Sequence, residues 1–537
     1  MFGSPAAAGR GWVIGLVTLS GIMLVAMVFY PFGYDQAVFS TGGAMIVHGA
    51  FPYRDFLDTK PPLIFYLYAG AQLLFGTQEW SIRLFDILWH GVTAFYFYRI
   101  LRRYFSIERS LVSISLTIIL YAGSGFWMTA QAESFGILPS LLLFDCTLRA
   151  VEHPERAVKY GAIAGLAATM LLLLKVTLIL SVGAAMVMLF LASKKKIMCW
   201  LAYTAALVVV VLALSIIVGV ALVHAGAGER FLEWVQWISQ YASITSLQHP
   251  AWEELLVEFP LTFLYSMSPL LFFFAGRAVI EWNRNTYRPE QKLFFRLLAL
   301  TIGFHLIGIL LERKIEFEYQ YTRYLWAATP FAAIGLFYWE SAFRKFRLWN
   351  WPVGTVLFIL LMFTTSPLAR LFTQTLPWSW VTLRHGNAAA EVQRRIPNYF
   401  SGDEERVAQY LNTRMKPSEQ LFFWGNDVAI YGLTNRMPQT SCLTATPFRT
   451  TFTPLAWKDS LIHQLSTTSP AFFVVEFGDA RPESTGSKLD SYQALNAWDG
   501  LRTFLTRRYV LDTTIGHFFI FARGTQEIRD EGGPSAG

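Results

Sequence analysis

Long apolar stretches separated by short polar loops make up the first two thirds of the chain. Runs of about spanning length recur near residues 11–31, 80–100, 110–128, 135–149, 160–174, 176–193, 198–223, 260–280, 293–311, 323–341 and 350–366. A transmembrane helix needs about 20 mainly apolar residues, with a range of roughly 17 to 25. The pattern therefore predicts a polytopic α-helical membrane protein with about 11 transmembrane helices within residues 1–366.

Residues 160–193 allow two interpretations. At about 1.5 Å per residue, one helix over this run would be roughly 50 Å long, whereas the hydrocarbon core is about 30 Å thick. Basic residues flank both ends of the run, which places both ends on the same side of the membrane. A tight hairpin of two short helices with Lys175 at its turn fits these facts. The alternative is an ordinary helix end from which Lys175 reaches the interface.

The pattern changes after residue 366. Apolar runs shrink to five or six residues, and helical patterns at about 402–414, 456–468 and 490–507 alternate with strand-like runs at 420–424, 471–477 and 517–522. Alternating helices and strands favour an α/β arrangement. We expect residues 367–537 to form a soluble, extracytoplasmic α/β domain that ends in a disordered polar tail at 524–537.

Composition agrees with a membrane protein and gives its orientation. Of the 537 residues 54% are hydrophobic and 15% are charged, whereas a soluble domain carries about 25% charged residues. The formal net charge of +7 comes from Lys and Arg clusters in alternate loops, so we expect membrane orientation and no nucleic-acid partner. This alternation predicts a cytoplasmic N-terminus, a first outer loop at 33–79 and an outer C-terminal domain. The three cysteines are not placed as a pair, so no disulfide is expected.

Ionisable residues gather on the predicted outer side. Asp35 follows the first apolar run, and Lys60 precedes two prolines that restrict its backbone. A fixed ammonium at the interface suits a phosphate ligand, although an interfacial anchor is the simpler alternative. Asp55 and Asp58 are more readily explained as helix caps or anchors. Glu133 and Lys175 reach the same side from other loops.

Two aromatic segments also lie on the outer side. Trp237 belongs to a series at helical spacing with Trp234 and Tyr241, which is typical of a buried helix face, with sugar stacking or lipid contact as the alternative. Residues 319–324 contain Arg323 and three tyrosines, Tyr319, Tyr321 and Tyr324. They form either a pocket for the carrier and its sugar or an aromatic belt at the membrane surface.

Several motifs resemble bacterial membrane glycosyltransferases of the GT-C type, the superfamily of protein O-mannosyltransferases and lipid A aminoarabinose transferases. In chain order they are Asp35, Lys60-Pro61-Pro62-Leu63, Leu74-Phe75-Gly76 with Arg83, Gln131-Ala132-Glu133, Lys175, Tyr319–Pro330 and Val407–Asn435. One position departs from the family pattern. Many relatives carry a second ionisable residue after the first-loop Asp, whereas this chain has Gln36, which is not an acid. The second acidic position is therefore assigned to Glu133.

The resemblance implies transfer of a single sugar from a polyprenyl-phosphate carrier to an acceptor hydroxyl, at the outer (periplasmic) face of a bacterial inner (cytoplasmic) membrane. The acceptor is an envelope lipid, glycan or protein. Asp35 is the expected general base and Glu133 the second catalytic residue, and an attack opposite the leaving group inverts the anomeric centre. The expected ligands of the carrier phosphate are Lys60, Arg83, Lys175 and Arg323, and the expected sugar or lipid pocket contains Tyr319, Tyr321, Tyr324 and Trp237.

Three alternatives stay open at this stage. Asp35 and Glu133 would suit a Mg²⁺ or Mn²⁺ ion, but no dense carboxylate cluster demands one, so no cofactor is certain. A membrane transporter or lipid flippase would also have many spans, but it usually places ionisable groups near the bilayer midplane and often contains internal repeats. An oligosaccharide ligase that uses a pyrophosphate-linked glycan is poorly separated from a single-sugar transferase.

Overall fold

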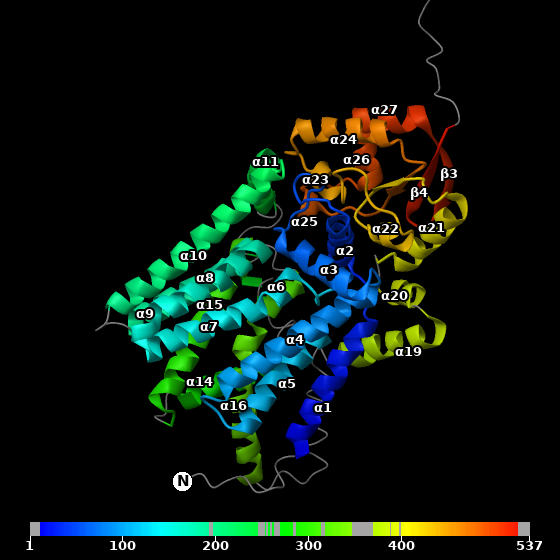
Figure 1. The fold of residues 1–537 in the computed structure, drawn as a ribbon. Coiled ribbons are helices and arrows are strands. Elements are labelled where there is room, and N and C mark those ends of the chain that lie inside the picture. Colours follow the sequence, from blue (N-terminus) through cyan, green and yellow to red (C-terminus); the bar gives the residue numbers. More distant parts are fainter. Residues whose placement is uncertain are drawn as a thin grey trace, which may run out of the picture.

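The protein consists of a long helical bundle and a domain with a small β-sheet at one end of it (Figure 1). The computed structural model describes residues 11–192, 197–244, 269–282, 286–312, 317–345, 369–386, 388–396 and 399–524, with single positions between 253 and 261. The predicted span at 350–366 and almost all of the predicted tail lie outside these residues. The structural statements below concern the described residues only.

The bundle helices coincide with the predicted apolar runs. Five stretches are long and apolar enough to cross a membrane: Gly11–Phe29, Ala132–Glu152, Pro154–Leu174, Ile197–His224 and Pro289–Glu312. The bundle elements are α1 (Gly11–Ala26), η2 (Met27–Phe29), α4 (Glu79–Leu101), α5 (Ile107–Gly123), α6 (Ala132–Phe135), α7 (Ile137–Glu152), η3 (Pro154–Arg156), α8 (Ala157–Leu174), η4 (Val176–Ile179), α9 (Leu180–Ala192), α10 (Ile197–His224), α14 (Pro269–Trp282), α15 (Pro289–Glu312), η7 (Glu318–Tyr324) and α16 (Leu325–Lys345). The predicted polytopic helical class is confirmed, and about 11 spans remains a prediction.

The chain reverses direction at Lys175. Helix α8 ends there because Lys175 has an extended backbone, with φ −164° and ψ 125°. Helices α8 and α10 run side by side in the same direction, since a Cβ on Gly161 would meet Tyr203 and one on Gly165 would meet Leu207. The intervening α9 must therefore run back, as the hairpin interpretation predicted. Its arms are splayed, because α8 packs on α10 and α7 whereas α9 packs on α15 and α7.

Two helices of the first loop lie between the bundle and the C-terminal domain. They are α2 (Tyr34–Val47) and α3 (Leu63–Phe75), and they pack closely on each other. A Cβ on Gly43 would lie 2.9 Å from the backbone nitrogen of Ala69, so the close approach requires glycine. Helix α2 is largely buried, because α3 and the C-terminal domain cover it.

The C-terminal domain is built on a four-stranded sheet in the order β1-β2-β4-β3, with β1 and β2 parallel and the other pairs antiparallel. Its strands are β1 (Leu421–Trp424), β2 (Phe472–Glu476), β3 (Tyr509–Ile515) and β4 (Phe518–Arg523). The helices are η8 (Leu371–Thr375), α19 (Leu376–His385), α20 (Ala389–Arg395), α21 (Ser401–Arg414), α22 (Ala429–Leu433), α23 (Thr446–Arg449), α24 (Leu455–Thr468), α25 (Pro482–Thr485), α26 (Ser491–Ala497) and α27 (Asp499–Arg508). The α/β prediction is confirmed, but β3 was not predicted: it lies at the sheet edge, where several side chains stay exposed and the apolar signal is weak.

Helix α11 (Gly228–Ile244) attaches the bundle to this domain. Trp237 donates a hydrogen bond to Thr450 Oγ1 over 3.2 Å, and Trp457 donates one to Glu233 over 2.6 Å. Trp234 donates to the backbone oxygen of Asp58 in the first loop over 2.6 Å. The aromatic series at helical spacing is therefore a buried helix face that joins α11 to the first loop and to the C-terminal domain.

Candidate functional site

Four charged side chains from distant parts of the sequence meet at the turn of the α8–α9 hairpin. Lys175 forms ion pairs with Glu133 from α6 and, over 2.5 Å, with Glu312 at the end of α15. Arg323 from η7 lies 2.9 Å from Glu312 and 3.6 Å from Glu133. We call these four residues the charged cluster. All four side chains are buried or nearly so, and two cations facing two carboxylates make the burial tolerable.

A strained turn presents Glu133 to the charged cluster. Ala130 has a φ of +56°, which costs a residue with a Cβ about 1–2 kcal/mol. Two tyrosines hold this turn: the Ala130 N–H donates to Tyr121 Oη over 2.9 Å, and Tyr68 donates to the Ala130 carbonyl over 3.0 Å. Helix α6 starts directly afterwards, so Glu133 sits in its first turn, where a negative charge complements the helix dipole.

Lys60 and Tyr319 extend the charged cluster towards the first loop. The Nζ atoms of Lys60 and Lys175 lie 5.2 Å and 5.6 Å from the centre of the same Tyr319 ring. Burial alone would lower the pKa of Lys60, but Tyr319, Glu133 and Asp35 outweigh it and hold that pKa well above its usual value. These interactions favour the charged ammonium form of Lys60. Among the described residues no carboxylate lies within ion-pair distance of it.

Asp58 fixes the turn that carries Lys60. Its carboxylate accepts a hydrogen bond from the Lys60 backbone N–H over 3.0 Å. Burial raises the pKa of Asp58 to about 6, although this hydrogen bond and the Lys60 charge work in the opposite direction. Asp58 therefore stabilises a turn and does not cap helix α3, whose N-cap residue is Pro62, so the helix-cap interpretation of Asp58 was wrong.

Asp35 lies in the first turn of α2 and is half-buried. Its carboxylate interacts electrostatically with Lys60, Tyr319 and Asp58. Within the described part of the chain it accepts no hydrogen bond, so its oxygens are available to a substrate. The neighbouring Gln36 is fully buried: its amide nitrogen donates to the carbonyls of Phe126, Trp127 and Thr129, and its oxygen accepts from the Gly33 N–H. Gln36 thus anchors the helix start on which Asp35 sits.

The sequence pattern did not single out Glu312. The residue follows an apolar run, and in the sequence it is indistinguishable from an ordinary helix end. In the structure it pairs with both Lys175 and Arg323 and accepts a hydrogen bond from Thr177. An acid directly after a spanning run, on the side already occupied by Glu133 and Lys175, is the only signal that could have revealed it.

The structure does not bring every predicted site residue to this place. Arg83 is buried and donates to the backbone carbonyls of Tyr30, Pro31 and Phe126 and to Thr129 Oγ1, so it braces two loops. Trp237 lies against the C-terminal domain, as described above. Tyr321 and Tyr324 are buried in an apolar core shared with α1 and α5. Of the four predicted pocket residues, Tyr319 is the one that contacts the lysines.

The side chains around Glu133 do not suit a resident divalent cation. One of its oxygens is paired with Lys175 and lies near Arg323, and Lys60 adds a third positive charge. In the described residues no group of three or more His, Cys, Asp or Glu side chains is arranged to hold a metal ion. Its other oxygen is buried without a hydrogen-bond partner, which suits a donor group of a bound substrate.

Comparisons with known proteins agree on one family of folds. Residues 59–221 match the family described as dolichyl-phosphate-mannose-protein mannosyltransferase. The crystal structure of apo ArnT from Cupriavidus metallidurans is 13% identical, with a TM-score of 0.56, and covers 97% of this chain and 100% of its own. ArnT bound to undecaprenyl phosphate is 12% identical, with a TM-score of 0.53, and the match covers 96% of this chain and 99% of the ArnT chain. No curated protein sequence matches the chain.

The family match includes Lys60, Arg83, Glu133 and Lys175, and the structural similarity extends over nearly the whole chain. The family match covers less than half of the chain, and at 12–13% identity the similarity to ArnT shows a shared fold. Both findings confirm the predicted fold class and agree with the resemblance and the enzyme class predicted from the sequence.

Proposed function

We propose that this GT-C type protein transfers a single sugar from a polyprenyl-phosphate carrier to an acceptor hydroxyl, with Asp35 as the general base. The observation that carries the proposal is the convergence of Lys60 and Lys175 on the Tyr319 ring, with Arg323 next to Glu133 and Glu312. The half-buried carboxylate of Asp35 interacts with Lys60 and Tyr319 at the same place. Undecaprenyl phosphate in the ArnT structure supports a carrier of this class. The acceptor is an envelope lipid, glycan or protein, and the reaction takes place on the outer side of a bacterial inner membrane.

The three cations are suited to the departing phosphate. When the bond between the anomeric carbon and the carrier oxygen breaks, negative charge develops on the phosphate, and fixed cations in a water-poor site stabilise it best. Lys175 and Arg323 are already oriented by Glu133 and Glu312, whereas Lys60 has no carboxylate partner within ion-pair distance in the described residues. Lys60 is therefore the cation most available to a new anion.

Asp35 is suited to activate the acceptor. Its carboxylate takes the proton of the acceptor hydroxyl while the acceptor oxygen bonds to the anomeric carbon and the carrier phosphate leaves. A single displacement of this kind inverts the configuration at that carbon. The unpartnered oxygen of Glu133 is placed to accept a hydrogen bond from the sugar or the acceptor, as expected for the second acidic residue.

The base assignment is tested by comparing purified wild-type protein with Asp35→Asn, using polyprenyl-phosphate sugars and extracted envelope acceptors. Loss of a general base lowers a rate by about 10²- to 10⁴-fold, so we expect a loss of this size with unchanged carrier binding. Asp499→Asn, at a side chain that is 84% exposed in the C-terminal domain, is the matched control. Transfer by Asp35→Asn at the wild-type rate would show that Asp35 is not the base. If the wild type consumed no monophosphate-linked sugar but moved substrate across liposomes, the transporter alternative would hold.

The phosphate assignment is tested by binding of polyprenyl phosphate alone. A hydrogen bond to a charged group contributes about 1.5–3 kcal/mol, so Lys60→Gln should bind the carrier about 10- to 100-fold more weakly. The control is Arg54→Gln in the same loop, because the Arg54 side chain is exposed and pairs with Asp55. Equal affinity of Lys60→Gln and wild type would remove Lys60 from the phosphate site.

A further inference from the structure

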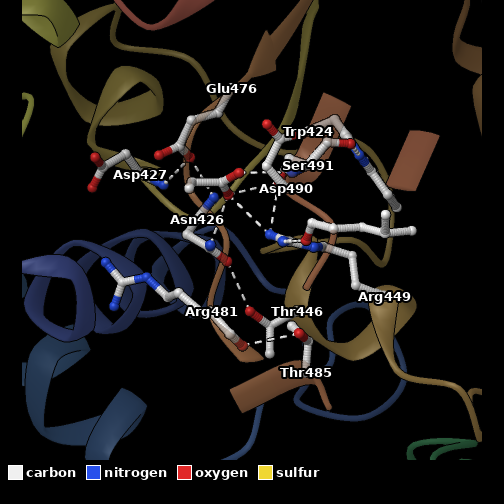
Figure 2. A network of polar contacts seen from close by, with 12 residues as sticks. Trp424, Asn426, Asp427, Thr446, Arg449, Glu476, Arg481, Thr485, Asp490 and Ser491 are labelled. Atoms are coloured by element: carbon white, nitrogen blue, oxygen red, sulfur yellow. Dashed lines mark hydrogen bonds and ion pairs between the residues drawn. The ribbon is translucent and has the colours of Figure 1, made fainter. Parts of the chain in front are cut away.

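The two loops that follow the parallel strands of the C-terminal domain are tied into one rigid unit (Figure 2). The Glu476 carboxylate at the end of β2 accepts the backbone N–H groups of Asn426 and Asp427 over 2.6 Å and 3.1 Å. Asp479 accepts from the Asn426 side chain over 2.8 Å and pairs with Arg449 over 2.9 Å. The ends of parallel strands are a common functional edge of α/β sheets, and here they carry buried charged groups.

This unit contacts the helix start that carries Asp35. The Arg481 guanidinium, from the loop after β2, lies 3.7 Å from the centre of the Tyr34 ring. Tyr34 also interacts with Asp427, from the loop after β1. The backbone carbonyl of Arg481 accepts from Thr485 over 2.9 Å, which fixes its loop. A guanidinium that lies on a buried aromatic face makes a strong, directional contact.

Further contacts hold the same turn. Tyr399, just before α21, donates a hydrogen bond to the Phe32 carbonyl. From the bundle side, the Trp127 ring lies 5.5 Å from the Tyr34 ring, and Gln36 is anchored as described above. Contacts from the helical bundle on one side and from the C-terminal domain on the other thus fix the start of α2. Consecutive residues of a helix point about 100° apart, so Tyr34 is directed to the C-terminal domain while the adjacent Asp35 interacts with Lys60 and Tyr319.

We propose that Arg481 is a positioning residue for sugar transfer: its contact with Tyr34 holds the start of α2 against the C-terminal domain and thereby fixes the direction in which Asp35 meets the acceptor. This proposal rests on the proposed function, because it assigns Asp35 as the base. It gives the C-terminal domain a defined part in the reaction, in which Arg481 acts through Tyr34. A shift of about 1 Å in a catalytic group can lower a rate by about 10²-fold, so a contact that fixes the position of Asp35 is sufficient to control the rate of transfer.

The first measurement needs no activity. Hydrogen exchange of the backbone amides of residues 34–40 is compared between full-length wild type, Arg481→Ala, Arg481→Lys and the control Arg502→Ala. Arg502 is half-exposed, pairs with Asp499 and belongs to α27, outside the two loops. We expect exchange at least about tenfold faster in Arg481→Ala, partial recovery in Arg481→Lys and no change in the control. Unchanged exchange in Arg481→Ala would overturn the proposal.

The second measurement separates positioning from general damage. We expect Arg481→Ala and Tyr34→Leu each to lower kcat about 10- to 100-fold, with the KM for the donor within about twofold of wild type. Because both act through one contact, the double variant should lose no more than the worse single variant. The proposal would be overturned if the losses in kcat of the two single variants multiplied in the double variant. It would also be overturned if the KM for the donor rose by as large a factor as kcat fell. If hydrogen exchange responds as expected but the wild-type protein transfers no sugar, the proposed function is wrong, while the role of Arg481 in fixing the start of α2 is still supported.

Discussion

The Nζ atom of Lys175 lies 2.5 Å from a carboxylate oxygen of Glu312. Glu312 also pairs with Arg323, so one carboxylate orients two of the three cations of the candidate site. This contact joins the turn of the hairpin to the end of α15, two places that are 137 residues apart by number (312 − 175).

Replacing Glu312 by Gln should destabilise the protein and slow the reaction. Removal of one partner from a buried ion pair costs about 3–5 kcal/mol, because the remaining charges stay buried without compensation. We expect a lower melting temperature and transfer reduced about 10- to 100-fold. Glu155→Gln is the control, since its side chain is 65% exposed and surface substitutions usually change stability by less than about 0.5 kcal/mol. Equal melting temperatures for Glu312→Gln and wild type would contradict this role.

Gln36→Glu should not supply a useful second acid. The Gln36 amide nitrogen donates to three carbonyl oxygens. A carboxylate has no hydrogen to donate, so in this place it would repel the three oxygens and leave them without a hydrogen bond from residue 36. A buried charge without partners costs several kcal/mol, so we expect a clear drop in melting temperature and loss of transfer. Gln236→Glu, at an exposed position of α11, should behave like wild type. A stable, active Gln36→Glu protein would show that this turn tolerates the acid that many relatives carry.

Stability should fall as the pH rises through neutrality. Burial raises the pKa of Asp427 to about 7, from about 3.9 in an unfolded chain, and those of Glu404 and Glu476 well above their usual range. The folded protein therefore binds more protons than the unfolded chain between these pKa values, so the stabilisation is present below about pH 4 and is lost as the pH rises through about 7. The charged or titratable groups that face Asp427 are Tyr34, Tyr399, Glu404, Glu476, Asp479 and Arg481.

The measurement is the melting temperature of the full-length protein between pH 5 and pH 8. The wild type should lose stability over this interval, and Asp427→Asn, which cannot ionise, should lose less. Glu404 and Glu476 still titrate in the variant, so its slope should be reduced and not abolished. An equal or steeper slope in Asp427→Asn would rule out Asp427 as a contributor.

Transfer should not depend on a divalent cation. Three cations already surround Glu133 and its neighbour Glu312, so a metal ion would meet repulsion and few free oxygens. We expect full activity after exhaustive treatment with a chelator. Activity that is lost in chelator and restored by Mg²⁺ or Mn²⁺ would reinstate the metal site considered from the sequence.

Much of the fold and part of the site were predictable from the sequence. The run from residue 11 to residue 29 and the break at Lys175 follow from the length of an apolar helix, which depends only on local composition. Four charged residues stand out in the sequence because they lie at the ends of apolar runs on one side of the membrane: Asp35, Lys60, Glu133 and Lys175. Glu312 has the same local pattern, but nothing local distinguishes it from a helix end.

The sequence by itself determined the helical bundle and the α/β character of the C-terminal domain, because hydrophobic periodicity and helix length are properties of neighbouring residues. It left two interpretations of residues 160–193 open, and the packing of α8, α9 and α10 decided for the hairpin. Only the tertiary structure decided that Arg83 braces loops, that Trp237 joins α11 to the C-terminal domain, and that Arg481 grips Tyr34 beside Asp35. Such contacts join residues tens to hundreds of positions apart. They depend on how whole helices and strands pack, and no pattern of neighbouring residues records that.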